Sequence, residues 1–502
     1  MTVEACATPA DVATAAADLV AGLALDPWGS VRPSVYETGR LVALAPWLEG
    51  HRQRIEYLLD TQRADGGWGG PGGYALVPTL SATDGLLSAL GVGPATERGL
   101  AALAGLLRAP GPVIPDLPAV ELIVPALIAS LNERLRDSGR GGLPLPSTID
   151  GATLGRVRAS LASGINAPQK LLHAWEILGV PRAGRVPVPV ADGPVGGSPA
   201  ATAAWLRDHG GSEPAWRYLE RAVRHQGGPV PCAAPITVFE RAWVLNWLAE
   251  AGVPVTPPEG LLRDLDVAIG EHGVAAGPGL PNDADTTAVA LSALAQFGMP
   301  REPASLWAYE LPSHFCTWQG EDGRSVSVNA HVLEAFGHWL GSAARDAERY
   351  RAAAVRLSGW LVAQQQPDGS WTDRWHASPF YATACCVQAL SRFGYGDEAE
   401  AAIGRAVEWV LANRRPDGSW GWWRTTDEET AYAMRILLTI TSGRSEEAIA
   451  GGYRHLSEAI RAGSVVGSGD PPMWHDKDLY SPLAIVHAAV LAALHQAQRL
   501  FS

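Results

Sequence analysis

The chain has 502 residues, of which 47% are apolar and 18% are charged, and its formal net charge is −13. This composition provides for a large buried core and excludes an intrinsically disordered chain. The acidic balance, without any basic stretch, argues against nucleic acid as a partner, and the length predicts two large domains or about three smaller ones.

The five cysteines, Cys6, Cys232, Cys316, Cys385 and Cys386, form no CxxC pair. This pattern is typical of a reducing compartment and not of a disulfide framework. The sequence shows no leader pattern and no unbroken apolar run long enough to span a bilayer. We therefore expect a soluble cytoplasmic protein without membrane insertion, as a monomer or a homodimer.

Helical periodicity runs along most of the chain. Apolar residues recur at three- and four-residue steps, and these stretches end at Gly or Pro, which is typical of amphipathic helices. Alternating strand patterns are scarce, and residues 185–190 are interrupted by prolines. The pattern predicts an all-α fold of about twenty helices. The clearest helices are expected at residues 240–251, 285–297, 328–341, 381–393 and 483–499.

A turn of related sequence occurs three times. Residues 62–68 read QRADGGW, residues 365–371 read QQPDGSW and residues 414–420 read RRPDGSW. Each copy follows a helical stretch, Asp-Gly favours a tight turn with positive φ, and Trp can stack over neighbouring helix ends. The repeat predicts a scaffold of helix pairs and explains part of the excess of 19 Trp over 7 Phe.

Two breaks suggest where the domains divide. The Gly/Pro-rich residues 179–199 predict a long loop, and residues 208–214 predict a second interruption. We place the main boundary near residue 220.

Residues 281–289 read PNDADTTAV and open an apolar stretch that ends at Gly298. Asp283 is a favourable N-cap, and acidic residues suit the positive end of a helix dipole. A helix start therefore accounts for both aspartates, and only the rest of the chain can indicate whether one of them carries chemistry.

The Trp turns and the D-x-D-T-T segment at 283–287 resemble the class II terpene cyclases, which start cyclisation by protonating an alkene. Further segments match blocks of that family, in family order, over most of the chain. They are VYET at 35–38, PTL at 78–80, Glu121 in VELIVPAL, KLLH at 170–173, SPAAT at 198–202, FERAW at 239–243, SVNAH at 327–331, WHASP at 375–379, GWW at 421–423 and WHDKDLY at 474–480.

The resemblance implies two α/α-barrel domains, called β and γ, with γ inserted after the first helix of β. The active site of the family lies between them. We accordingly expect a γ domain at residues 20–220 and a β domain made of residues 1–19 and 221–502.

The sequence departs from the family in its acidic motifs. The usual motif is D-x-D-D, and Thr286 stands at its fourth position, but the middle aspartate, Asp285, which the resemblance makes the general acid, is present. The EDxxD cluster that holds magnesium and diphosphate in many relatives is absent, and Asp116 and Glu121 are the only acids near its place. Mg²⁺ is the expected cofactor, with Glu121 as its candidate ligand.

The motifs of class I synthases, which ionise the diphosphate, are missing. No D-D-x-x-D is present, and the N-D-x-x-T pattern that begins at Asn282 has Ala290 where a glutamate is required. The product is therefore expected to keep its diphosphate.

Protonation of an isoprenoid alkene needs a strong acid aimed at one carbon in a dry cavity. At a helix start, the dipole and free N–H groups stabilise the Asp285 carboxylate, whereas burial favours its protonated form. Asp283, Thr286 and Thr287 are candidates to orient the proton by hydrogen bonding, although capping and first-turn packing also account for them.

Three further sets of candidates complete the predicted site. Aromatic faces can stabilise the migrating cation, although core packing is the plainer role for any single ring. The candidate rings are Trp375, Tyr381, Trp422, Trp423, Trp175 and Trp205, the last two where relatives carry smaller side chains. Asn329 and His331 are candidates to position a water or to accept the final proton. Lys170, Lys477 and Arg40 are candidates to bind the diphosphate.

We therefore predict an isomerase that converts a linear prenyl diphosphate into a bicyclic one. Trp175 and Trp205 can shorten the pocket, and D-x-D-T-T resembles the motif of the drimenyl diphosphate synthases among bacterial relatives. The resemblance therefore favours farnesyl diphosphate as substrate and drimenyl diphosphate as product. The alternative is geranylgeranyl diphosphate with a copalyl- or clerodane-type product. A squalene or hopene cyclase needs more Trp turns, and a protein prenyltransferase needs a zinc site. The non-enzymatic alternative is a Trp-rich α-barrel that binds a carbohydrate or a partner.

Overall fold

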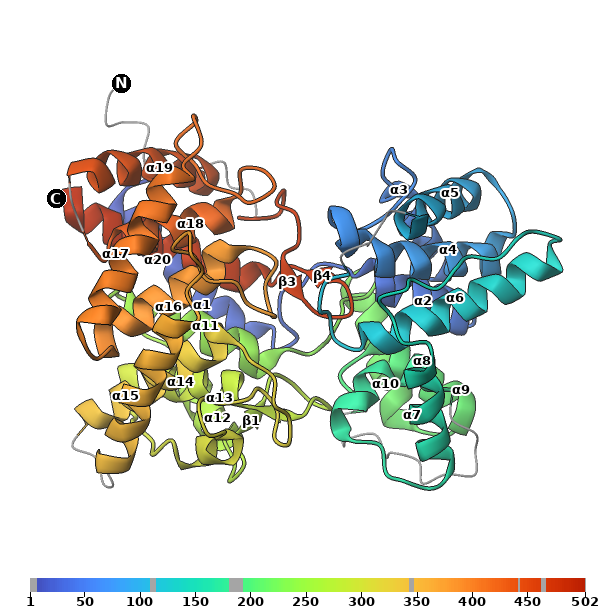
Figure 1. Cartoon of the computed structure of the whole chain (residues 1–502), viewed down its shortest axis with the longest axis horizontal. Helices are drawn as coiled ribbons and strands as arrows, with labels where there is room; N and C mark the ends of the chain where they lie inside the picture. The colour runs from blue at the N-terminus through green and yellow to red at the C-terminus, as the bar shows by residue number, and fades with distance from the viewer. Residues whose placement is uncertain are drawn as a thin grey trace.

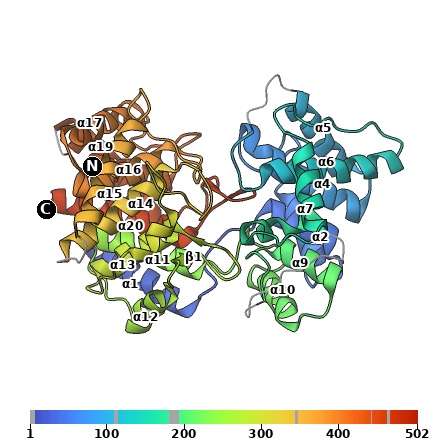
Figure 2. The ribbon, with the colours of Figure 1, turned by 60° about the horizontal axis from the view of Figure 1, so that its bottom comes forward.

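The computed structural model describes residues 7–108, 114–179, 193–342, 347–440, 443–461 and 466–501. Over these ranges the chain forms two helical domains that lie side by side (Figure 1). The same two domains are distinct in a second view (Figure 2). The prediction of an all-α fold in two helical barrels is confirmed, with helices α1 to α20 in the described ranges. Most of the expected loop at 179–199 falls on residues 180–192, outside them.

In the C-terminal domain, the described residues include a closed ring of helices in which each helix packs on the next and the last packs on the first. The ring is α11 (Thr237–Glu250), α13 (Ala284–Gln296), α14 (Val326–Gly341), α16 (Pro379–Phe393), α18 (Asp427–Leu437) and α20 (Leu483–Phe501). An outer layer covers it: α12 (Glu259–Ala268), α15 (Ala347–Ala363), α17 (Asp397–Ala412) and α19 (Gly443–Arg461). Inner helices such as α13 and α14 are buried on nearly all sides, which explains their weak amphipathic patterning.

The N-terminal domain repeats this arrangement on a smaller scale. Its ring is α2 (Val35–Leu44), α4 (Leu76–Leu90), α6 (Val120–Asp137), the short α8 (Trp175–Leu178) and α9 (Pro199–His209). Outside it lie α3 (His51–Asp60), α5 (Pro94–Arg108), α7 (Ala152–Ala162) and α10 (Glu213–His225). No helix among the described residues combines the length and the apolar content needed to cross a bilayer.

The first helix of the chain belongs to the C-terminal domain. Helix α1 (Pro9–Leu25) packs on α20 and α11, and its buried side chains share their apolar core. Residue 20 falls inside α1 and residue 220 inside α10. We therefore propose that the chain crosses between the domains in the segments that follow these two helices.

Two short hairpins add the β structure of the described residues. Strand β1 (Val274–Ala275) pairs with β2 (Asn282–Asp283) directly before α13, and β3 (Trp474–His475) pairs with β4 (Leu479–Tyr480). The β3–β4 hairpin extends from the C-terminal domain into the N-terminal domain (Figure 1). Both hairpins border the space between the domains.

The three Trp turns tie helix ends to their neighbours. In the second turn, the buried Trp371 indole N–H donates to the Leu361 carbonyl at 2.8 Å. The Gln365 amide donates to the Gly369 and Ala402 carbonyls, each at 2.8 Å. The indole bond recurs from Trp68 to Leu58 and from Trp420 to Val410. The turns are therefore scaffold.

Trp371→Phe removes the indole donor, so the Leu361 carbonyl keeps only the Gln364 N–H as a donor and the bond that ties the turn to α15 is lost. We expect the free energy of unfolding, measured in urea, to fall by about 1–3 kcal/mol. Trp422→Phe is the matched control, because Trp422 is 53% exposed. Equal changes in both variants would contradict this role of the turn.

Candidate active site

A cavity of about 460 Å³ lies between the two domains, a size typical of small-molecule sites. The N-terminal domain lines it with residues 116–119, 121, 170–171 and 173–174. The C-terminal domain lines it with the start of α13, the β3–β4 hairpin and side chains near residues 317–321 and 374–375. Both domains are needed to form the cavity.

The two aspartates lie where β2 meets α13. Asp283 ends β2 in extended conformation and caps α13, as the sequence predicts. Its Oδ1 accepts from the Thr286 backbone N–H at 2.6 Å, and its Oδ2 accepts from the Thr286 hydroxyl at 2.9 Å. Asp285 follows in the first helical turn and lines the cavity with Asp283 and Thr286. The strand therefore sets where the helix begins and which way Asp285 points.

His331, from the neighbouring ring helix α14, contacts Asp285. Its Nδ1 lies 2.6 Å from Asp285 Oδ1, and its ring packs edge-on against Trp243. Burial opposes a charge on this imidazole, but the Asp285 carboxylate outweighs burial and raises the pKa of His331 well above its ordinary value. A protonated His331 donates to Oδ1, which makes the carboxyl group of Asp285 a better proton donor through its other oxygen.

Asp283 favours its neutral form. Burial, reinforced by the Asp285 charge, raises the pKa of Asp283 to about 8, although the Thr286 donors oppose the rise. The two carboxyls thus differ in their surroundings, because His331 contacts Asp285 and not Asp283.

Aromatic rings form much of the cavity wall. Phe239 and Trp243 pack with centroids 4.4 Å apart, and Trp318 packs edge-on against Trp375 at 5.2 Å. Trp474 and Tyr480 of the β3–β4 hairpin add to this wall. Such π faces stabilise a cation without reacting with it. Among the rings predicted from sequence, Trp375 is the one that lines the cavity.

The other predicted rings lie elsewhere. Trp175 and Trp205 pack in the core of the N-terminal domain, so they do not shorten the cavity, and that expectation is wrong. Trp422 is exposed, and Trp423 packs edge-on against Tyr74 outside the cavity. Tyr381 is buried behind the wall, stacked on His376.

Asn329 and Thr287, both predicted at the site, instead form hydrogen bonds to backbone groups of neighbouring segments. The Asn329 amide accepts from the Phe315 N–H at 2.8 Å and donates to the Phe315 and Ser325 carbonyls. The Thr287 hydroxyl donates to the Asp283 carbonyl at 2.6 Å and accepts from the Val274 N–H at 2.9 Å. Neither lines the cavity, so their contacts are structural.

Two cations line the more exposed part of the cavity, each in an ion pair across the domains. Lys170 contacts Glu321, and Arg374 lies 3.4 Å from Asp116. Lys170 was predicted from sequence, but Arg374 was not. Both are close to solvent, with side chains 40% and 25% exposed, so an anionic ligand can exchange with the carboxylates.

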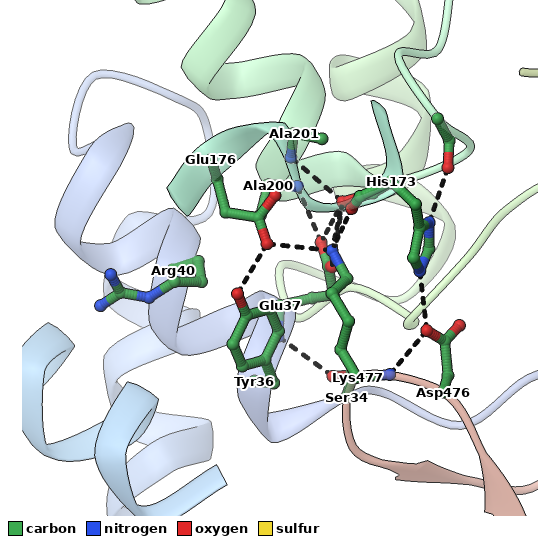
Figure 3. Close-up of polar contacts among 12 residues, drawn as sticks. Ser34, Tyr36, Glu37, Arg40, His173, Glu176, Ala200, Ala201, Asp476 and Lys477 are labelled. Atoms are coloured by element: carbon green, nitrogen blue, oxygen red, sulfur yellow. Dashed lines mark hydrogen bonds and ion pairs between the residues drawn. The ribbon is translucent and has the colours of Figure 1, made fainter. Parts of the chain in front are cut away.

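Lys477 does not line this cavity. It lies at the tip of the β3–β4 hairpin, fully buried in the N-terminal domain (Figure 3). Its ammonium contacts Glu37, lies 3.1 Å from Glu176 and donates to Ser198 Oγ at 2.9 Å. Burial disfavours the charge, yet Glu176 and Glu37 raise the pKa of Lys477 above its ordinary value. Lys477, which the sequence predicts to bind the diphosphate, therefore forms an interdomain contact instead.

Arg40 is also structural. Its guanidinium is paired with the buried Asp84 and donates to Ser81 Oγ at 3.2 Å. Figure 3 shows Arg40 pointing away from the Lys477 ammonium. It does not line the cavity, because Asp84 on the next ring helix compensates its charge inside the N-terminal domain.

The acidic residues near the absent EDxxD motif do lie at the cavity. Asp116 and Glu121 both line it and offer carboxylate oxygens, the ligands that Mg²⁺ prefers. Among the described residues, no group of three or more His, Cys, Asp or Glu side chains is arranged to hold a metal. This donor set fits a Mg²⁺ ion whose coordination is completed by phosphate oxygens and water.

Several functional residues escaped the sequence analysis. Phe239, Trp243, Trp474 and Tyr480 stand in motifs that matched the family, but nothing in the motifs separates rings that face a cavity from rings that face a core. Arg374 precedes Trp375 and has no sequence signal of its own.

Comparisons with known proteins agree with this architecture. Residues 320–450 match the family model described as the squalene-hopene cyclase C-terminal domain. An ent-copalyl diphosphate synthase of Streptomyces sp. (strain KO-3988) is 45% identical over 97% of this chain and 96% of that protein. A labda-7,13-dienyl diphosphate synthase of Streptomyces clavuligerus is 41% identical over 98% and 94%. The solved ent-copalyl diphosphate synthase of Streptomyces platensis superposes with a TM-score of 0.88 at 43% identity, covering 97% and 99% of the two chains.

Lys477→Met leaves Glu37 and Glu176 buried without their cation. We expect the free energy of unfolding to fall by about 3–5 kcal/mol, measured in urea. Lys170→Met is the matched control, because its ion pair is partly exposed and contributes at most about 1 kcal/mol. Similar losses in both variants would contradict the structural assignment of Lys477.

Asp283→Asn keeps the cap but cannot ionise. The folded state of the wild type binds the Asp283 proton more tightly than the unfolded state does. This stabilisation is complete below pH ~4 and is lost as pH rises through about 8. From pH 5 to 8.5, the wild type should therefore lose about 4 kcal/mol of unfolding free energy relative to Asp283→Asn. A constant difference across this range would exclude the raised pKa.

Proposed function

The chain belongs to the bacterial class II terpene cyclases, and from that premise we propose that it converts geranylgeranyl diphosphate into a bicyclic, copalyl-type diphosphate. The observation that carries the proposal is Asp285, which faces an aromatic cavity from the start of α13 and is hydrogen-bonded to His331. Membership makes the chain an isomerase-type cyclase. The proposal concerns the length of its substrate and the class of its product.

Two observations favour the longer substrate over farnesyl diphosphate. Full-length relatives above 40% identity carry the names copalyl and labdadienyl diphosphate synthase, which denote bicyclic twenty-carbon products. Trp175 and Trp205, on which the shorter pocket depended, lie outside the cavity.

In the proposed mechanism, Asp285 donates its proton to the terminal alkene of the folded polyene. The His331 imidazolium stabilises the carboxylate that remains, and free N–H groups at the start of α13 act in the same direction. General acid catalysis of this kind contributes about 10²–10⁴-fold. Folding the chain in advance against the wall supplies part of the barrier lowering, up to about 7–11 kcal/mol for a fully oriented reaction.

The rings of Phe239, Trp243 and Trp474 line the path along which the cation migrates. Lys170 and Arg374 bind the diphosphate, exchanging Glu321 and Asp116 for phosphate oxygens. Asp116 and Glu121 would hold Mg²⁺, which neutralises diphosphate charge when bound. Among the described residues, no acidic cluster is arranged to bind the metal ions that would ionise the diphosphate. The product therefore retains the diphosphate group.

The test is to incubate the protein separately with geranylgeranyl and farnesyl diphosphate, remove the diphosphate and identify the alcohols by mass spectrometry. We expect a bicyclic twenty-carbon alcohol, with kcat/KM at least ~10-fold above that for farnesyl diphosphate, since extra buried methylenes add binding energy. A drimane alcohol formed faster from farnesyl diphosphate would reverse the assignment.

Asp285→Asn should lower kcat by about 10²–10⁴-fold without loss of substrate binding. Asp397→Asn is the matched control, because Asp397 also lies in the first turn of a helix of the same domain but is exposed and distant from the cavity. Equal activity of the two variants would exclude Asp285 as the acid.

A further inference from the structure

A buried carboxyl group lies directly behind one ring of the cavity wall. Glu428 belongs to the first turn of α18, and it is 2% exposed. Its Oε1 accepts from the Trp474 indole N–H at 2.7 Å. Trp474 lines the cavity and Glu428 does not. The carboxyl is therefore one side chain away from the space in which the carbocation forms.

Two further donors reach the same carboxyl oxygen. The Tyr432 hydroxyl donates to Oε1 of Glu428 at 2.9 Å, and His376 Nε2 lies 3.2 Å from it. His376 Nδ1 accepts from the Ser378 backbone N–H at 3.0 Å, so the proton of this neutral ring is on Nε2, which donates to Glu428. Hydrogen bonds from three donors, Trp474 included, stabilise the carboxylate form of Glu428.

The start of α18 does not depend on this side chain. Thr426 is the N-cap, and its hydroxyl accepts from the Glu429 backbone N–H at 3.1 Å. Asp470 Oδ2 accepts from the Asp427 backbone N–H at 2.9 Å. The Glu428 carboxyl instead receives its hydrogen bonds from side-chain rings, so capping of the helix does not account for it.

No lysine or arginine of the described ranges forms an ion pair with Glu428, whose partner within 4 Å is the His376 imidazole. Arg32 acts on Glu428 through space, because its guanidinium donates to the Asp470 and Gly467 carbonyls at 2.7 and 2.6 Å. The carboxylate charge is therefore shared with the rings that donate to it, since hydrogen bonds in a buried site polarise the groups that form them.

We propose that Glu428 is a positioning residue of the cyclase, which holds the Trp474 ring in the cavity wall and strengthens the attraction of that ring for the carbocation. The inference rests on the proposed cyclase function and extends it. A carboxylate at the indole N–H raises the electron density of the ring, and the attraction of a π face for a cation grows with that density.

This arrangement supplies negative charge to the wall without a nucleophile. A carboxylate exposed in the cavity would form an ester with the carbocation or remove a proton before both rings close. The Trp474 ring separates Glu428 from the cavity, so the charge reaches the cation and the oxygens do not. The charge also reaches Tyr480 of the wall, where burial is the main cause that raises the pKa of the phenol and Glu428 adds to the rise.

Backbone contacts keep the strand of Trp474 in place independently of Glu428. Trp474 forms a β-bridge with His376, and the Ala377 N–H donates to the Met473 carbonyl at 2.8 Å. The Trp474 ring also packs on Tyr381, with centroids 4.7 Å apart. Loss of the Glu428 charge should therefore leave strand β3 in position.

The test is Glu428→Gln, which removes the charge while its amide oxygen can still accept the three hydrogen bonds. Two analogues of geranylgeranyl diphosphate serve as probes. In the first, a protonated amine replaces the carbon that becomes cationic, and in the second the terminal alkene is saturated. We expect Kd of the ammonium probe to rise at least ~10-fold and Kd of the saturated probe to stay within about twofold of wild type. In turnover, kcat should fall by a similar factor with KM nearly unchanged.

Glu429→Gln is the matched control, because Glu429 is the adjacent buried carboxyl but accepts from the Thr426 hydroxyl and the Trp422 backbone N–H, outside the cavity. Both probes should bind this variant within about twofold of wild type. An equal loss of both probes in Glu428→Gln, or the same loss of the ammonium probe in Glu429→Gln, overturns the proposal.

Trp474→Phe keeps a ring but has no N–H for the carboxylate. In this background, Glu428→Gln should change the ratio of the two Kd values by less than about threefold. A full ~10-fold change there would overturn the role of the ring. Failure of the wild type to form any bicyclic product would overturn the proposed function instead. Normal wild-type turnover with an unchanged Kd ratio in Glu428→Gln would remove only the present inference.

Discussion

Burial of the Lys477 ammonium between Glu37 and Glu176 determines where the β3–β4 hairpin of one domain enters the other. The hairpin also carries Trp474, His475 and Tyr480, which line the substrate cavity. A buried ion pair costs desolvation energy, and removal of one partner costs several kcal/mol, so the hairpin has one favourable position. The cavity thus has a defined shape because the two barrels cannot slide past each other without exposing this charge.

Neighbouring Asp478 supports the same contact. Its carboxylate accepts from the Ser34 hydroxyl at 2.7 Å and from the Tyr36 N–H at 2.9 Å, at the start of α2. Asp476 binds His173 at 2.7 Å on the side that faces the cavity. Residues 476–478 of the hairpin therefore bind the N-terminal domain, and Trp474 and Tyr480 on either side of them form part of the cavity wall.

The acid site depends on a contrast between two carboxyls two residues apart. Asp283 caps α13, and burial, reinforced by the Asp285 charge, raises its pKa to about 8, whereas Asp285 contacts His331. A scaffold that keeps Asp283 uncharged removes a repulsive neighbour from Asp285 when Asp285 becomes an anion.

The sequence by itself determined the helices, the Trp turns, the cap at Asp283 and the position of Asp285, because each depends on residues close together in the chain. It identified Lys170 and Trp375 at the cavity but misplaced Lys477, Arg40, Trp175 and Trp205. A buried and a ligand-facing Lys or Trp have the same local sequence pattern, and burial is set by partners far away in the chain, such as Glu37 for Lys477. Only the tertiary structure decided which cations meet carboxylates in a core and which rings face the space between the domains.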